Sequence, residues 1–332
     1  MHELAFPLLA GLIAIALLFD FLNGLHDAAN SIATVVSTRL IPPVWAVVFA
    51  AFGNFAAYWL VGLHVAETVG KGIIDKDAVT PAVVFGALIG AIFWNVVTWL
   101  KGIPSSSSHA LIGGLLGAGI AHGGFGVVES SGTTKTVIAI FLSPMLGFVL
   151  AMLMVLVTSW LFKGFQPRRA EGVFKTLHLF SSAAYSISHG GNDAQKTMGI
   201  ITVLLYSTGQ LKGEFHIPEW VVISCYAAIA LGTMSGGWKI IKTMGTKITK
   251  LNHHTGFSAS TAGSIVVFGA SAMGIPVSTT HAITGSVIGT GAARKASAVR
   301  WGVAGRVVTA WFITIPASAA VGAVFYVLTR MF

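Results

Sequence analysis

Residues 102–113 read GIPSSSSHALIG, and the same pattern returns at residues 274–285 as GIPVSTTHAITG. Seven of the twelve positions are identical, and three others exchange Ser for Thr or Leu for Ile. A second pair of elements precedes these two in the same order: NGLHDAAN at residues 23–30 and HGGNDAQK at residues 189–196 share Gly, Asp and Ala. Two elements that recur in the same order at nearly the same spacing indicate an internal duplication.

The composition places both copies in a membrane. Of the 332 residues, 55% are apolar and only 9% are charged, whereas a soluble domain carries about 25% charged residues. This composition excludes an ordinary soluble enzyme, a disordered chain and a nucleic-acid-binding protein. The duplication predicts two transmembrane repeats, residues 1–165 and 166–332, as in many secondary transporters.

Apolar runs near the ~20 residues that a membrane helix needs recur along the chain. They are residues 4–22, 43–63, 81–100, 137–162, 218–234, 257–275 and 302–328. Weaker, more polar segments lie between them, at residues 23–38, 103–121, 177–207 and 276–292. We expect an all-α polytopic membrane protein with about nine to twelve transmembrane or re-entrant helices. Polar, interrupted segments in matching places favour two inverted repeats, with broken helices or hairpins at the midplane.

Basic residues between the apolar runs predict the orientation of the chain. They cluster in the linker 163–175, at residues 239–250 and at residues 294–300. By the positive-inside rule these three clusters face the cytoplasm. We interpret the net charge of +9 as this topology signal and not as a surface for a polyanionic partner.

Each copy of the longer element places a proline before a run of hydroxyl side chains. Proline favours the start of a helix, so these residues are expected in a first turn, where backbone N–H groups are unpaired and the helix dipole is positive. Two such turns facing each other would form a cradle for a tetrahedral oxyanion. The candidate donors are Ser105, Ser106, Ser107, Ser108, Ser278, Thr279 and Thr280. Helix capping and hydrogen bonding between helices are the alternative roles of these side chains.

Each copy of the shorter element places a carboxylate, Asp27 or Asp193, at membrane depth. Burial there costs about 2.5–3.5 kcal/mol, so a functional role is expected. We expect broken helices here, in which carbonyl groups freed by neighbouring glycines join the carboxylate around a small cation; alternatively the carboxylate binds a proton. The candidate coupling residues are Asn23, His26, Asp27, Asn30, Asn192 and Asp193, with the two aspartates as metal ligands if the ion is Na⁺. The structural alternatives are helix capping and pairing of Asp193 with Lys196.

Histidines also lie within the repeated elements, at His26, His109, His189 and His281. Because histidine titrates near neutral pH, it suits proton coupling or a pH gate, although a hydrogen-bonded structural histidine is equally compatible. A zinc site is not expected, since no ligand spacing fits and the single cysteine, Cys225, lies inside an apolar run. Ser108 and His109 are neighbours in sequence and do not face each other on a helix, so an intramembrane hydrolase is not expected.

The four elements together resemble the paired signatures of PiT-type inorganic phosphate transporters, in particular the bacterial low-affinity branch. The resemblance covers both halves and implies an inverted-repeat helical fold and cation-coupled uptake of inorganic phosphate. The implied substrate site comprises Asp27, Asn30, Asn192, Asp193 and the two hydroxyl runs. Sodium-coupled members have Asn-Asp in both short elements, whereas the first element here has His26-Asp27. This form resembles the branch associated with proton symport of phosphate or of metal–phosphate complexes.

We therefore expect a symporter of inorganic phosphate, driven by H⁺ or Na⁺, that works by alternating access in the plasma (inner) membrane. A permease for another tetrahedral oxyanion, such as sulfate, is the alternative. The expected partners are phosphate and the lipid bilayer, with no nucleic acid and no cofactor beyond the co-transported ion. The sequence leaves open whether phosphate travels as a metal complex and whether the protein forms a homodimer.

Overall fold

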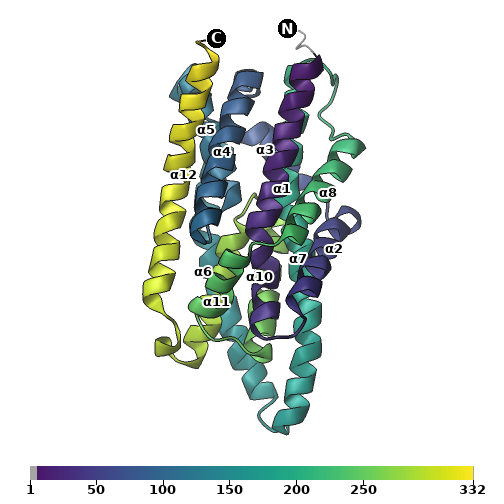
Figure 1. Cartoon of the computed structure of the whole chain (residues 1–332), viewed down its shortest axis with the longest axis vertical. Helices are drawn as coiled ribbons and strands as arrows, with labels where there is room; N and C mark the ends of the chain where they lie inside the picture. The colour runs from purple at the N-terminus through teal and green to yellow at the C-terminus, as the bar shows by residue number, and fades with distance from the viewer. Residues whose placement is uncertain (1–5, 332) are drawn as a thin grey trace.

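A computed structural model describes residues 6–331 as an almost entirely helical bundle (Figure 1). The helices of the first half are α1 Phe6–Ser37, α2 Pro43–Leu60, α3 His64–Gly72, α4 Pro81–Lys101, α5 Ser107–Gly123 and α6 Ser130–Leu161. Those of the second half are α7 Pro167–Ser207, α8 Glu219–Ser235, α9 Trp238–Lys242, α10 His253–Ala272, α11 Thr279–Arg294 and α12 Trp301–Thr329. A π-helical turn, Thr243–Lys247, continues α9. Within the described range, β-type pairing is limited to one isolated bridge between Ile74 and Val128.

Length and composition make this a multi-pass membrane protein. Five of the described helices, α1, α2, α4, α6 and α12, are long and apolar enough to span a bilayer. α8 and the segment Trp238–Lys247, bent by 65° against each other, have together the length and composition of a broken span or a re-entrant loop. α6 exposes large apolar side chains such as Phe141 and Leu153, as expected where helices meet lipid. The polar motif residues of α1, α5, α7 and α11, in contrast, are buried inside the bundle. The expected all-α membrane architecture is confirmed, although residues 4 and 5 of the first apolar run lie outside the described range.

The two halves run in opposite directions. Figure 1 shows the start of α1 and the end of α12 at one end of the bundle and the connection between α6 and α7 at the other, so α1 and α7 start at opposite ends. The halves also exchange partners: α5 packs against α12 and α11 against α6, while α8 packs against α1 and α2 against α7. This reciprocal packing is what inverted repeats related by a pseudo-two-fold axis require. We propose that the repeats divide in the α6–α7 connection, as residues 1–165 and 166–332.

Figure 1 places the starts of α7 and α12, and with them the first and third basic clusters, at the end of the bundle opposite the start of α1. The second cluster begins deeper, where Lys239 donates to the Leu100 carbonyl at 3.2 Å beside the end of α4. Arg294 donates to the carbonyl of Lys250 at 3.2 Å, and the Arg300 backbone N–H donates to the carbonyl of Ile248, so the second and third clusters adjoin. Of the first cluster, only the start lies in the connection between the halves. Pro167 begins α7, and the remaining basic residues lie in the first turns of that helix. By the positive-inside rule, this end is expected to face the cytoplasm.

The expectation of broken helices around the two aspartates is wrong. Asp27 lies inside the continuous helix α1, and Asp193 lies inside the continuous helix α7. The glycines of these elements let helices approach instead of freeing carbonyls: a Cβ at Gly24 would lie 2.1 Å from the Ile229 carbonyl oxygen, and one at Gly190 would lie 2.5 Å from Asn54 Cα. Small residues commonly serve close helix contacts in membranes.

The breaks occur in the longer repeated elements. α4 ends at Lys101, and the following Gly102 has a φ of 63°, in the left-handed region; the corresponding Gly274 has a φ of 66°. Only glycine adopts this conformation without a steric cost, so both chains can turn sharply there. The turns of residues 102–106 and 273–278 then lead into α5 and α11, which form two helical hairpins with α4 and α10. These turns meet in the middle of the bundle.

Candidate functional site

The polar motif of α1 forms a single buried face. Asp27 and Asn30 follow Asn23 at positions i+4 and i+7, and His26 follows it at i+3, so the four side chains project from one side of the helix. Each of the four residues has at most 2% of its surface exposed. Buried polar groups are stable only when other polar groups satisfy them. Their partners come from the tips of the two hairpins.

Both hairpin tips present the start of a helix to this face. Ser106 caps α5 by accepting a hydrogen bond from the His109 N–H at 3.2 Å, and Ser278 caps α11 by accepting one from the His281 N–H at 3.2 Å. The oxygen atoms of these two serines therefore take the capping role that the sequence leaves open, and each hydroxyl keeps its own O–H donor. The first turns behind them direct their unpaired N–H groups and the positive dipole ends into the middle of the bundle.

Asp27 binds hydroxyls from both hairpins. Ser107, at the start of α5, donates to Asp27 Oδ2 at 2.8 Å and also contacts Asn23 Oδ1 at 2.6 Å. Thr280, at the start of α11, donates to Asp27 Oδ1 at 3.3 Å and itself accepts from Asn30 Nδ2 at 2.9 Å. The carboxylate of the first half is thus linked to the second half across the interface.

Asp193 binds the equivalent hydroxyls of the two hairpins. Thr279 donates to Asp193 Oδ2 at 2.9 Å, and Ser108 donates to Asp193 Oδ1 at 3.4 Å. Lys196 donates both to Ser108 Oγ and to Asp193 Oδ1. Ser107 and Thr279 are equivalent positions of the repeat, as are Ser108 and Thr280. The same pattern of hydroxyl donors to a carboxylate therefore occurs once around Asp27 and once around Asp193.

His26 gives the first half a partner that the second half lacks. Its Nδ1 lies 2.7 Å from Asp27 Oδ1, and its Nε2 lies 3.1 Å from the Thr98 hydroxyl on α4. At the equivalent position, Asn192 donates to Ser271 at 2.8 Å. Instead, His189 Nε2 lies 3.2 Å from Asp193 Oδ2, one helical turn away on α7.

The two carboxylates form one centre and not two separate pockets. Ligand atoms of Asp27, Asp193 and His189 all lie within 4.8 Å of one another. Two negative charges this close repel each other by about 3 kcal/mol at an effective dielectric constant of ~20. A cation or a proton placed between them relieves this repulsion, and carboxylate and hydroxyl oxygens suit a small hard cation. The same centre therefore offers anion donors and cation ligands side by side.

The structure gathers most of the expected site residues, but not all of them. Asn23, Asp27, Asn30, Ser107, Ser108, Asp193, Thr279 and Thr280 form the centre. Ser105 lies behind it and donates to the Thr98 hydroxyl at 3.0 Å, while Ser106 and Ser278 cap helices. The sequence motifs do not predict the contribution of Tyr185, whose hydroxyl donates to the Thr279 carbonyl at 2.9 Å. It carries no sequence signal because it lies outside the duplicated elements.

The histidines that follow the two hydroxyl runs pack against each other. The rings of His109 and His281 meet edge to face, with centroids 4.5 Å apart, and His281 also stacks on Trp311 at 3.8 Å. Both histidines are buried. These contacts join the two hairpins directly behind their hydroxyl-bearing turns and correspond to the structural role that the sequence leaves open.

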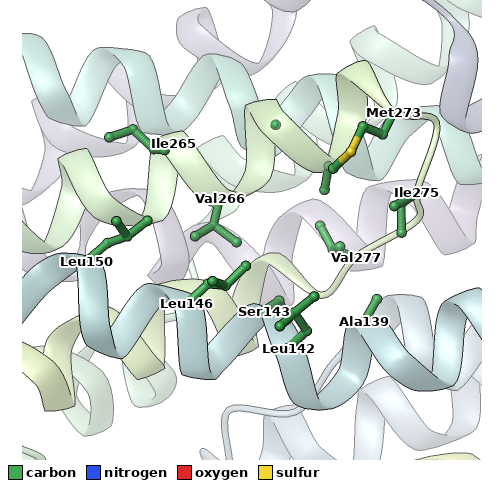
Figure 2. A pocket seen from close by; sticks show the side chains of 12 residues that line it. Ala139, Leu142, Ser143, Leu146, Leu150, Ile265, Val266, Met273, Ile275 and Val277 are labelled. Carbon is green, nitrogen blue, oxygen red and sulfur yellow. The ribbon is translucent and has the colours of Figure 1, made fainter.

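A cavity of about 180 Å³ between α6 and α10 is not the polar site. Figure 2 shows its lining, which is apolar except for Ser143 and includes Leu146, Val266 and Met273. Several of these side chains are half exposed on the lipid-facing surface of the bundle. An inorganic ion would gain no polar partner here. The buried carboxylate centre is thus the better candidate for ion binding.

Comparisons with known proteins agree with this geometry. A sequence model of the phosphate transporter family matches residues 23–322. The probable low-affinity inorganic phosphate transporter of Rhizobium meliloti is 63% identical over 323 residues, covering 97% of both chains. The Bacillus subtilis protein with the same description is 43% identical over 318 residues, covering 95% of both chains. A solved structure described as a sodium-dependent phosphate transporter superposes with a TM-score of 0.91 at 26% identity, covering 98% of this chain and 100% of that one.

Proposed function

Because the chain belongs to the phosphate transporter family, we propose that it carries inorganic phosphate across the plasma membrane together with H⁺ or Na⁺. The family and its relatives are transporters and not enzymes. The solved relative is described as sodium-dependent. For this chain, the identity of the coupling ion and the transport cycle are part of the proposal.

The observation that carries this proposal is the meeting of two carboxylates with two helix starts. Phosphate is an anion, and its binding beside Asp27 and Asp193 requires additional positive charge. The hydroxyls of Ser107 and Thr279 donate to Asp27 and Asp193 in this structure. A cation on the carboxylates would free them to donate to phosphate oxygens, beside the N–H groups of their turns. A co-transported cation at the carboxylates supplies the missing charge. Each ion then binds better in the presence of the other, which is the basis of coupling.

The burial of the centre supports alternating access. Asp27, Asp193 and the hydroxyl residues around them are at most 2% exposed, so the described conformation is closed to both sides. The binding residues come from both halves of the chain, and each hairpin packs against the last helix of the opposite half. Rocking of one set of helices against the other would open the centre to one side at a time.

Flux into proteoliposomes with separately imposed gradients tests the proposed function. Phosphate should accumulate inside vesicles when an inward gradient of the coupling ion is imposed, and not without one. If His26 marks proton coupling, a protonophore should abolish uptake and removal of Na⁺ should leave it unchanged; dependence on Na⁺ would assign that ion instead. Uptake that ignores both gradients would contradict symport. Competition by arsenate but not by sulfate is expected, and strong competition by sulfate would favour the broader oxyanion permease.

Removal of two hydroxyl donors should weaken phosphate binding. In the double variant Ser107→Ala, Thr279→Ala, the half-saturation concentration for phosphate should rise about 100-fold or more, because each of the two lost hydrogen bonds to a charged group contributes about 1.5–3 kcal/mol. Transport kinetics in cells, normalised to surface expression, measure this effect. The matched control is Ser235→Ala, Thr309→Ala, at two exposed helix positions. An unchanged half-saturation concentration would place phosphate elsewhere.

A further inference from the structure

A lysine side chain lies at the middle of the bundle. Lys196 is 1% exposed, in a chain whose other lysines are mostly found in the connections and near helix ends. Its ammonium donates to three oxygens, which are Asp193 Oδ1, Ser108 Oγ and, at 2.8 Å, the Val277 carbonyl. An ammonium group has three N–H donors, so this environment satisfies all of them.

The internal repeat identifies the residue of the first half that is equivalent to Lys196. Aligning the short elements puts Asn30 opposite Lys196. Asn30 donates to Thr280, which donates to Asp27; Lys196 donates to Ser108, which donates to Asp193. The two chains of hydrogen bonds are equivalent step by step. They differ in charge, because the first begins with a neutral amide and the second with a cation.

The oxygens around the ammonium are of the kinds that bind small hard cations. A carboxylate, a hydroxyl and a backbone carbonyl converge on Lys196 Nζ, and the carbonyl belongs to the non-helical turn before α11. Carbonyls of unwound segments and side-chain oxygens are the usual ligands of coupling ions in transporters with inverted repeats. Lys196 therefore stands where a cation bound to Asp193 would have to stand.

We propose that Lys196 is a resident cation. Its ammonium group occupies the cation-binding site at Asp193, so that a transported ion binds only at Asp27. This inference rests on the proposed function, because it concerns how many ions accompany each phosphate. It also gives phosphate one fixed positive charge that does not depend on the ion gradient.

The substitution Lys196→Asn tests this directly, since it gives the second half the residue that the first half has. The purified variant should gain a Na⁺ site: NaCl should raise its Tm by roughly 5 °C or more over choline chloride at equal ionic strength. Wild type and the control Lys175→Asn, at an exposed lysine paired with Glu171, should show a much smaller difference between the two salts. Asp193→Asn, Lys196→Asn should return to the wild-type difference between the two salts, because the carboxylate ligand of the added site is gone.

Transport provides the second measurement. In proteoliposomes, Lys196→Asn should require one more Na⁺ per phosphate than wild type, measured as the Na⁺ gradient that just balances a phosphate gradient. Should the variant be unstable, Lys196→Gln takes its place, and folding in NaCl but not in choline chloride supports the proposal. The proposal is overturned if Na⁺ stabilises neither variant more than wild type. If wild type transports no phosphate but Lys196→Asn gains the stabilisation by Na⁺, the proposed function is contradicted, whereas the role of Lys196 as the bound cation is supported.

Discussion

Phosphate uptake should fall about 100-fold, to the level of empty vesicles, when Asp27 is replaced by Asn. Asp27 carries the negative charge that a coupling ion would face in the first half of the site, beside the hydroxyls of Ser107 and Thr280. Loss of one carboxylate–cation attraction at 4–5 Å removes about 3–4 kcal/mol at an effective dielectric constant of ~20, which corresponds to a factor of 100 or more. Uptake of labelled phosphate into proteoliposomes measures the effect.

The Asp27→Asn variant should still insert and fold. Asparagine has the same shape, keeps one acceptor oxygen and is less costly than a carboxylate at membrane depth. Detergent extraction and size-exclusion chromatography should therefore give a normal yield. The matched control is Asp77→Asn, at an exposed position outside the long helices, which should transport like wild type. Near-normal uptake by Asp27→Asn would remove this carboxylate from the coupling mechanism.

The second large effect is expected at Asp193, and it concerns folding as well as transport. Replacing Asp193 with Asn leaves the Lys196 ammonium buried without its anionic partner. Breaking a buried ion pair in this way typically costs 3–5 kcal/mol. The yield of folded protein and its Tm should therefore fall well below those of Asp27→Asn, which strands no buried ammonium.

A double-mutant cycle separates the ion pair from other effects of this substitution. The variant Asp193→Asn, Lys196→Asn contains neither charge, so it should recover at least half of the stability that Asp193→Asn loses. Tm values of the two single variants, the double variant and wild type in the same detergent give the coupling between the two side chains. If the double variant is no more stable than Asp193→Asn, the pair does not stabilise the bundle.

The local sequence predicts much of this architecture correctly. The apolar runs predict membrane helices because each span must be about 20 residues long and apolar. The Gly-Ile-Pro and hydroxyl pattern predicts the two interrupted elements, and the structure places helix starts at Ser107 and Thr279. In contrast, the glycines beside Asp27 and Asp193 are read incorrectly as breaks. Glycine signals either a flexible backbone or a close helix contact, and only the position of the neighbouring helix distinguishes the two.

What the sequence alone determined is the duplication, and with it most of the residues that meet in the buried centre, because a repeated pattern is a property of the chain and needs no coordinates. The tertiary structure decided how these residues meet. Thr280 of one half binds Asp27 of the other, 253 residues away, and Ser108 binds Asp193. It also decided that Lys196 completes the second half of the centre with its own charge. Such contacts depend on how inverted helices pack across an interface, and the local spacing of residues carries no information about that packing.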